Sequence, residues 1–156
     1  MLFFSLALTC LLLVACLSDL KAFRIPNAVP FALIALFLIK AAAISGITVW
    51  PGHVVAFGLT FGLGILAFAL GLIGGGDAKL MAALALWFGM DALPSFLAIT
   101  AVGGGALALI LVAVRHVAAL GPIAAGPAAG WRLLHRHAPV PYALPITLAA
   151  LWLEWR

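Results

Sequence analysis

Residues 53–90 read HVVAFGLTFGLGILAFALGLIGGGDAKLMAALALWFGM, and this stretch decides which kind of fold the chain can form. The apolar run at 53–73 is long enough to cross a bilayer, which takes about 20 residues. It stops at Gly74-Gly75-Gly76-Asp77, and a shorter apolar run follows at 78–90. The shorter run is either a half-helix or a helix whose first turn starts below the membrane surface. In both cases Asp77 is expected close to the bilayer.

The composition leads to the same conclusion for the whole chain. Of its 156 residues, 67% are hydrophobic and 8% are charged; a soluble domain has about 45–50% and about 25%. These values exclude a water-soluble domain and a disordered chain. The net charge of +4 does not indicate nucleic acid, because the bases are scattered between apolar runs and form no basic face. The sequence therefore predicts an integral membrane protein.

The apolar runs and the breaks between them predict an all-α fold, a polytopic bundle of about six transmembrane helices in one membrane-embedded domain, residues 1–156. Residues 91–94 are expected to separate two of these helices. Repeated Gly-Pro pairs predict an interfacial loop at 115–139, anchored by Trp131. The helices are expected at residues 2–18, 28–45, 53–73, 78–90, 95–114 and 140–155.

The basic residues predict which way the bundle faces. Positive charge follows the first apolar run instead of preceding it, which favours a retained first helix with its N-terminus outside. Six bases then fall on the cytoplasmic side and two on the other side, as the positive-inside rule requires. The cytoplasmic bases are Lys21, Arg24, Lys79, Arg115, Arg132 and Arg136, and the outer ones are Lys40 and Arg156.

Two acids lie at helix ends that this topology places on one membrane face. Asp19 ends the first helix and Asp77 begins the fourth. Ionisable residues at membrane depth are costly and are therefore functional candidates. Two carboxylates in a poorly hydrated site share one proton. The ionised one can take a proton from water while the protonated one donates to a scissile carbonyl, as in aspartic proteases. The sequence thus permits hydrolysis without a metal or a cofactor.

Simpler roles are open for the same residues. Asp19 can form a loop ion pair with Lys21 or Arg24. Asp77 can be the N-cap of the fourth helix, with its carboxylate accepting backbone N–H bonds. The triplet at 74–76 is either a flexible turn or a stretch of backbone that an extended peptide approaches directly, since glycine has no Cβ atom.

Three motifs resemble segments of intramembrane aspartic peptidases. GGGDAKL at 74–80 is similar to their GxGD signature, and its lysine matches a residue common in the prepilin-peptidase branch. DLKAFRIPN at 19–27 is similar to the segment that closes the first helix of the type IV prepilin peptidase core. VPYALP at 140–145 is a weaker match to the segment that opens the last helix of that core, with Ala143 in place of glycine.

The resemblance implies which residues form the site. Asp19 and Asp77 are expected to be catalytic, and neither a metal nor a cofactor is implied. The residues expected to bind the substrate or to shape the site are Gly74, Gly75, Gly76, Lys79, Lys21, Arg24, Pro26, Asn27 and Pro141.

The resemblance also implies an activity. The expected reaction removes the leader from type IV prepilins, after a glycine, at the cytoplasmic face of a bacterial inner membrane. The implied partners are the lipid bilayer and a prepilin with a basic leader and an apolar helix, and a homodimer stays open. The segment at 19–27 is too short for the methyltransferase insertion of the long prepilin peptidases, so the chain resembles the short tight-adherence (Flp) pilus type.

Two other classes of function are compatible with these residues. One is a small proton-coupled transporter in which the carboxylates relay protons, and the other is a non-enzymatic assembly subunit of a secretion system. A transporter needs acids along a path across the bilayer, whereas Asp19 and Asp77 are expected at one face. Among the histidines, His53 is expected at the outer surface. His135 and His137 have no acid or cysteine beside them, so they do not indicate a metal site.

Overall fold

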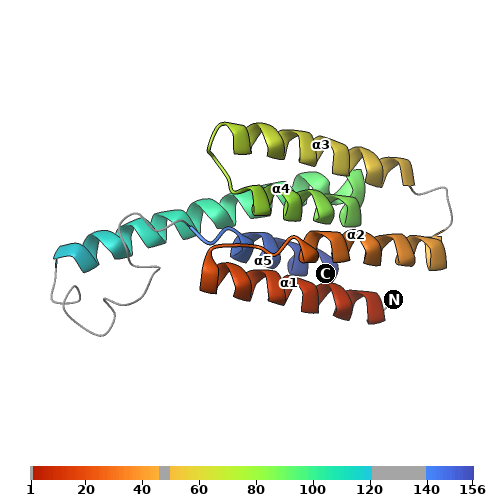
Figure 1. The fold of residues 1–156 in the computed structure, drawn as a ribbon, viewed down its shortest axis with the longest axis horizontal. Coiled ribbons are helices and arrows are strands. Elements are labelled where there is room, and N and C mark those ends of the chain that lie inside the picture. Colours follow the sequence, from red (N-terminus) through yellow and green to blue (C-terminus); the bar gives the residue numbers. More distant parts are fainter. Residues whose placement is uncertain (1, 46–49, 121–139) are drawn as a thin grey trace.

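The computed structural model describes residues 2–45, 50–120 and 140–156, and every regular element in these ranges is helical (Figure 1). The predicted all-α fold is therefore confirmed. The elements are α1 (Leu2–Ala22), α2 (Ala28–Lys40), the π-helix η1 (Ala41–Ser45) that continues α2, α3 (Trp50–Ala69), α4 (Gly75–Leu120) and α5 (Ala143–Glu154).

The described helices have the length and polarity of membrane spans. Leu2–Ala22, Trp50–Ala69 and Gly75–Val117 are long and apolar enough to cross a bilayer, and α2 and α5 are shorter apolar helices. Large apolar side chains also cover the outside of the bundle, for example Phe3 on α1 and Leu109 on α4. Such a surface suits lipid and not water. The chain is thus an all-α membrane protein.

The break in α4 differs from the expected one. Residues 91–94 were predicted to separate two helices, but they are helical, and Pro94 lies inside α4. The helical conformation is interrupted at Gly89 instead, where φ is 71° and ψ is −176°. Asp91 therefore falls in the first turn after the break, where the helix dipole favours an acid. The described residues form five α-helices, and the count of about six is not confirmed.

The two legs of α4 run in opposite directions. Figure 1 shows the chain turning back after the green first leg, so that the teal and cyan second leg returns toward the end where α4 begins. Across the turn, the ring centroids of Phe88 and Phe96 are 5.5 Å apart. The two legs thus pack as an antiparallel pair around Gly89.

His53 takes part in this turn, so the prediction of an exposed surface histidine is wrong. The imidazole is half-buried, and its ring centroid lies 5.1 Å from that of Phe37. Its Nδ1 lies 2.8 Å from the carbonyl oxygen of Leu86, to which the N–H donates. A Cβ atom on Gly89 would lie 3.0 Å from the imidazole. Glycine therefore suits this position for both its backbone and its contact.

Other helix ends also differ from the predicted ones. An apolar run indicates which residues lie within the membrane, whereas the backbone hydrogen bonds determine where the helix begins and ends. α1 continues past residue 18, so Asp19 is helical. α3 begins and ends earlier than 53–73, and α5 is shorter than 140–155. The segment expected as a loop from 115 is helical to Leu120. Trp131, Arg132, Arg136, His135 and His137 lie outside the described residues.

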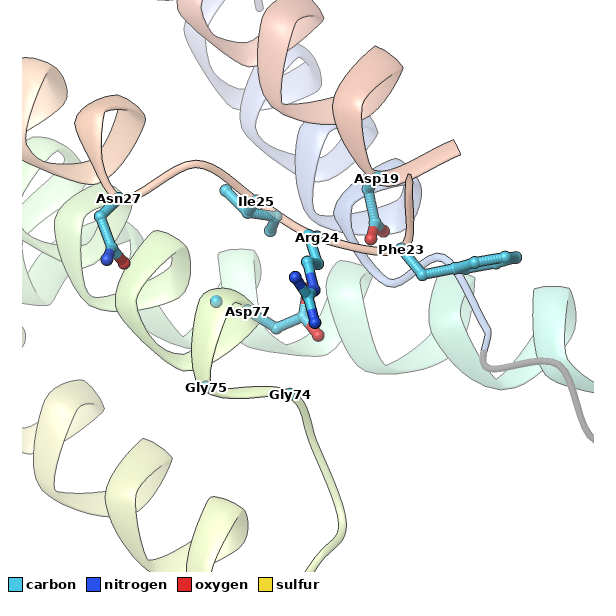
Figure 2. Close-up of a pocket in the computed structure, with 9 residues that line it drawn as sticks. Asp19, Phe23, Arg24, Ile25, Asn27, Gly74, Gly75 and Asp77 are labelled. Atoms are coloured by element: carbon cyan, nitrogen blue, oxygen red, sulfur yellow. The ribbon is translucent and has the colours of Figure 1, made fainter. Parts of the chain in front are cut away.

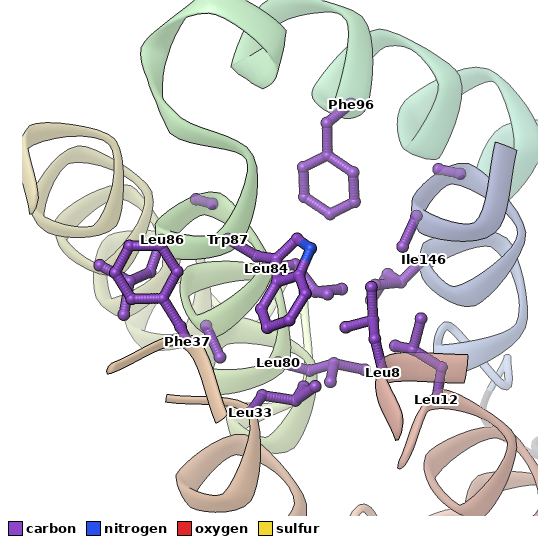
Figure 3. Close-up of a cluster of buried hydrophobic side chains, with 14 of the residues drawn as sticks. Leu8, Leu12, Leu33, Phe37, Leu80, Leu84, Leu86, Trp87, Phe96 and Ile146 are labelled. Atoms are coloured by element: carbon purple, nitrogen blue, oxygen red, sulfur yellow. The ribbon is translucent and has the colours of Figure 1, made fainter. Parts of the chain in front are cut away.

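The first leg of α4 occupies the middle of the bundle. α4 packs against α2, α3 and α5, and α1 packs against α2 and α5. Figure 3 shows the resulting core, in which Leu84 and Trp87 of α4 lie among side chains of α1, α2 and α5. Leu8, Leu33 and Ile146 are fully buried in it. This packing fixes the first leg of α4, which carries Asp77 in its first turn.

Three chain segments meet at one end of this bundle. Figure 1 shows the α1–α2 turn, the α3–α4 turn and the start of α5 at one end, and both chain termini at the other. The end of α1 and the start of α4 are thereby brought together.

Candidate active site

Asp19 is held by the first residue of α5. It lies in the last turns of α1 and is only 7% exposed. Its Oδ2 accepts a hydrogen bond from the backbone N–H of Ala143, at 3.1 Å. This N–H belongs to the first turn of a helix, where donors lack partners within the helix and the dipole favours a negative charge. The carboxylate is therefore directed inward, toward α5.

Asp77 lies inside the first turn of α4 and is not its N-cap. The first backbone bond of the helix runs from the N–H of Ala78 to the carbonyl of Gly74, at 3.1 Å. The Asp77 carboxylate forms a backbone hydrogen bond back to Gly74. This is the returning half of a capping box, in which the third helical residue binds the N-cap backbone. The half-buried Asp77 carboxylate is thus fixed beside the glycine turn.

The two aspartates line the same two cavities. Figure 2 shows Asp19 from α1 and Asp77 from α4 extending toward a common space. The first cavity has a volume of about 280 Å³ and continues toward Arg24 and Asn27 of the α1–α2 turn. The second has a volume of about 350 Å³ and continues toward Tyr142, beside the start of α5. The two aspartates therefore border both cavities.

At two of the three glycines of the turn, a Cβ atom would force a neighbouring side chain to shift. A Cβ atom on Gly74 would lie 2.8 Å from Oδ2 of Asp77, a separation that real Cβ atoms do not show. On Gly76 it would lie 3.2 Å from Cβ of Ile25, which is also tight. On Gly75 it would lie 3.4 Å from the Phe68 ring, an ordinary van der Waals contact. The two outer glycines of the Gly-x-Gly-Asp motif are thus the positions with close contacts.

The other predicted site residues of the α1–α2 turn take different places. Arg24 and Asn27 line the first cavity. Lys79 lies outside that cavity, but its Nζ donates to Oδ1 of Asn27 at 3.1 Å. Lys21 is exposed at the end of α1, and the Pro26 carbonyl accepts a backbone bond at the start of α2. Only part of the predicted set therefore borders the aspartates.

The segment before α5 contributes more than its sequence indicated. Pro141 is fully buried, and Val140 and Tyr142 line the second cavity. Ala143, the position where the motif departs from the family pattern, supplies the N–H that binds Asp19. A backbone donor depends little on the side chain, which explains why alanine can stand here in place of glycine.

Phe23 is a site residue that the sequence did not reveal. It lines both cavities together with the two aspartates. Its φ of 51° is left-handed, which a residue other than glycine adopts at a cost of about 1–2 kcal/mol. Helices commonly end on a residue in this conformation, but that residue is usually glycine. The sequence alone thus offered no signal that Phe23 ends α1 in this way.

The donor set at this site is two carboxylates. Among the described residues, no group of three or more His, Cys, Asp or Glu side chains is placed to hold a metal ion.

A family model matches the part of the chain that carries both aspartates. The model of the Type IV leader peptidase family matches residues 6–109, which include most of α1, the glycine turn and the first leg of α4. The segment before α5 lies beyond the match. Neither a curated protein nor a solved structure matches the chain.

Proposed function

The chain belongs to the type IV leader peptidase family, and on this premise we propose that it is an aspartic endopeptidase that removes the leader from Flp-type prepilins. The observation that carries the proposal is that Asp19 and Asp77, from different helices, line the same two cavities at one end of the bundle. Two carboxylates facing one space are the arrangement that aspartic proteases use to activate water.

The proposed reaction uses the carboxylates as an acid and a base. The ionised carboxylate takes a proton from water, and the water oxygen bonds to the scissile carbonyl carbon. The protonated carboxylate gives its proton to the carbonyl oxygen. When the C–N bond breaks, the leaving nitrogen takes the proton that the first carboxylate had removed from water. As the carbonyl re-forms, one hydroxyl of the intermediate returns its proton to the second carboxylate. The backbone hydrogen bonds at Asp19 and Asp77 stabilise whichever carboxylate is ionised.

The glycine turn suits a peptide substrate. Residues 74–76 lie beside the aspartates and present no side chain beyond Cα. An extended peptide that crosses the turn can therefore approach the backbone closely, with its scissile bond between the two cavities. We propose that cleavage follows a glycine of the substrate, since a small residue fits such a close approach.

The proposed substrate and membrane face follow from the turn and the basic residues. α1 ends at Ala22 and α2 begins at Ala28, so the segment between them holds no added domain. This supports the short tight-adherence type, without methylation. The excess of bases near the aspartates supports a cytoplasmic site in a bacterial inner membrane. The proposed partners are the bilayer and a prepilin with a basic leader and an apolar helix.

Coexpression with an Flp-type prepilin tests the proposal. Asp19→Asn and Asp77→Asn are each expected to abolish leader removal, because one carboxylate of the pair cannot act without the other. Asp91→Asn is the matched control, since Asp91 is exposed and lies outside the site. Mass spectrometry of the pilin N-terminus is the readout. Unchanged maturation by both site variants would contradict the two-aspartate mechanism.

Purified protein in liposomes separates the peptidase from a transporter. The wild-type protein is expected to cleave prepilin in the absence of any ion gradient. Gradient-dependent proton flux without cleavage would favour the transporter instead.

A further inference from the structure

A third cavity opens between α2 and α3, away from the aspartates. Its volume is about 140 Å³, and we call it the α2–α3 groove. Apolar side chains of α2 and α3 form its walls, Ala82 of α4 also lines it, and Lys79 is the charged residue among its lining. The wall residues used below are Phe31 and Ile34 of α2 and Phe57 and Phe61 of α3.

The walls of the groove reach the outer surface of the bundle. Phe31 is 69% exposed and Phe61 is 36% exposed. The rings of Phe57 and Phe61 are stacked, with their centroids 5.6 Å apart and their planes at 11°. α3, which carries this stacked pair, packs on α4. The groove is therefore open to the bilayer and has one preformed aromatic wall.

One end of the groove adjoins the aspartate cavity. Lys79 lines the groove, and its Nζ donates to Asn27, which lines the first cavity together with Asp19 and Asp77. α2 begins directly after Asn27 and carries Phe31 and Ile34 along the groove. A chain segment that leaves the first cavity along α2 therefore enters the groove.

We propose that the α2–α3 groove docks the apolar helix of the prepilin, taking one large aromatic or branched aliphatic side chain of that helix as a knob. This rests on the proposed function and names how its substrate is held. A volume of about 150 Å³ lined by apolar side chains accommodates a benzene-sized group. An unpaired apolar helix in a bilayer gains from such knob-into-hole packing, because lipid tails pack less closely.

The positive charge at the groove supports this occupant over the leader. Lys79 is the charged residue that lines the groove. A basic leader is repelled by its ammonium group, whereas an uncharged helix is not. The apolar part of the substrate therefore occupies the groove, and a lipid chain is the alternative that the experiment must separate.

Photo-crosslinking identifies what lies in the groove. p-Benzoylphenylalanine is placed at Phe31 or Phe61 in an Asp77→Asn background that retains uncleaved prepilin. Phe3 is the matched control, since it is a phenylalanine on α1 that is 71% exposed. Prepilin adducts at both groove positions, with a yield several-fold above that at Phe3, are expected. Equal yields at all positions, or lipid adducts without prepilin, would overturn the docking.

Kinetics with two substrates separate docking from catalysis. Phe61→Ala is expected to lower kcat/KM for full-length prepilin about tenfold through KM, since a tenfold change corresponds to one lost contact of about 1.4 kcal/mol. The loss is expected to be much smaller for a short peptide that spans the cleavage site and lacks the apolar helix. Leu63→Ala, on the same helix and 61% exposed, is the control and is expected to change neither value.

The two failures are distinguishable. If the wild-type protein cleaves neither substrate, the proposed function fails. If it cleaves both and Phe61→Ala lowers both values equally or neither, the docking alone is wrong. Because cleavage of the short peptide reports an intact fold, misfolding of the variant does not imitate the expected result.

Discussion

At the scale of single residues, the site depends on glycines, which have no Cβ atom. Gly74 and Gly76 lack the Cβ atoms that would meet Asp77 and Ile25 at 2.8 and 3.2 Å. Gly75, between them, has an ordinary contact at 3.4 Å with a phenylalanine ring. The three positions are adjacent and chemically identical in sequence, yet their tolerance of a methyl group differs.

Alanine substitutions at the three positions test this difference. Gly74→Ala is expected to lower the rate of leader removal at least about tenfold, because moving a catalytic group by a fraction of an ångström is costly. Gly76→Ala is expected to lower it as well, by displacing Ile25 and the turn that carries Arg24. Gly75→Ala is the control, and it is expected to change the rate of leader removal only slightly. Rates on one prepilin provide the comparison, and equal losses at all three positions would contradict the steric account.

At the scale of elements, α4 is shaped by a residue from another helix. An α-helical carbonyl normally accepts the N–H four residues further on, and for Leu86 that N–H lies past the break at Gly89. The imidazole of His53 on α3 occupies this place, with Nδ1 at 2.8 Å from the oxygen. α3 thus stabilises the turn between the two legs of α4.

Removal of this imidazole is expected to destabilise the bundle. His53→Ala leaves the Leu86 carbonyl, a main-chain group of a buried residue, without its partner, at a cost of about 1–3 kcal/mol. His116→Ala is the matched control, since His116 is exposed on the second leg of α4. Thermal unfolding in one detergent measures both variants. A midpoint for His53→Ala that equals the wild-type value would show that the contact contributes nothing.

At the scale of the whole molecule, polar contacts tie the helices together at points remote from the aspartates. The Glu154 carboxylate on α5 accepts bonds from Ser5 of α1, at 2.6 Å, and from Nε1 of Trp87 on α4, at 2.9 Å. The ammonium of Lys40 lies 4.3 Å from the centroid of a Trp87 ring. Side chains of α1, α2, α4 and α5 are therefore linked through Glu154 and Trp87.

Loss of this tie is expected to lower the stability of the bundle. Glu154→Ala removes two hydrogen bonds to a charged group, each of which contributes about 1.5–3 kcal/mol. Asp91→Ala is the control, because Asp91 is an exposed acid. The unfolding midpoint in detergent is expected to fall for Glu154→Ala only. An equal fall of the unfolding midpoint in both variants would show that the loss of a negative charge, and not the loss of the hydrogen bonds, lowers the stability.

Much of the candidate site was predictable because its signals are local. Apolar runs marked the helices of the bundle, and acids at the ends of two of them marked Asp19 and Asp77. The residues that were missed act at long range or through the backbone. The Ala143 N–H that binds Asp19 is 124 residues away in sequence. Phe23 adopts a conformation that its side chain does not favour.

The amino-acid sequence is sufficient to predict a membrane-embedded helical chain, with two acids at helix ends and glycines beside one of them. Hydropathy predicts which segments leave water, and the lack of a Cβ atom is a property of glycine in any fold. The break of α4 at Gly89, the bond from α5 to Asp19 and the groove between α2 and α3 are visible in the folded molecule alone. These features depend on how helices distant in sequence pack against one another, and packing is a property of pairs of surfaces that no single segment encodes.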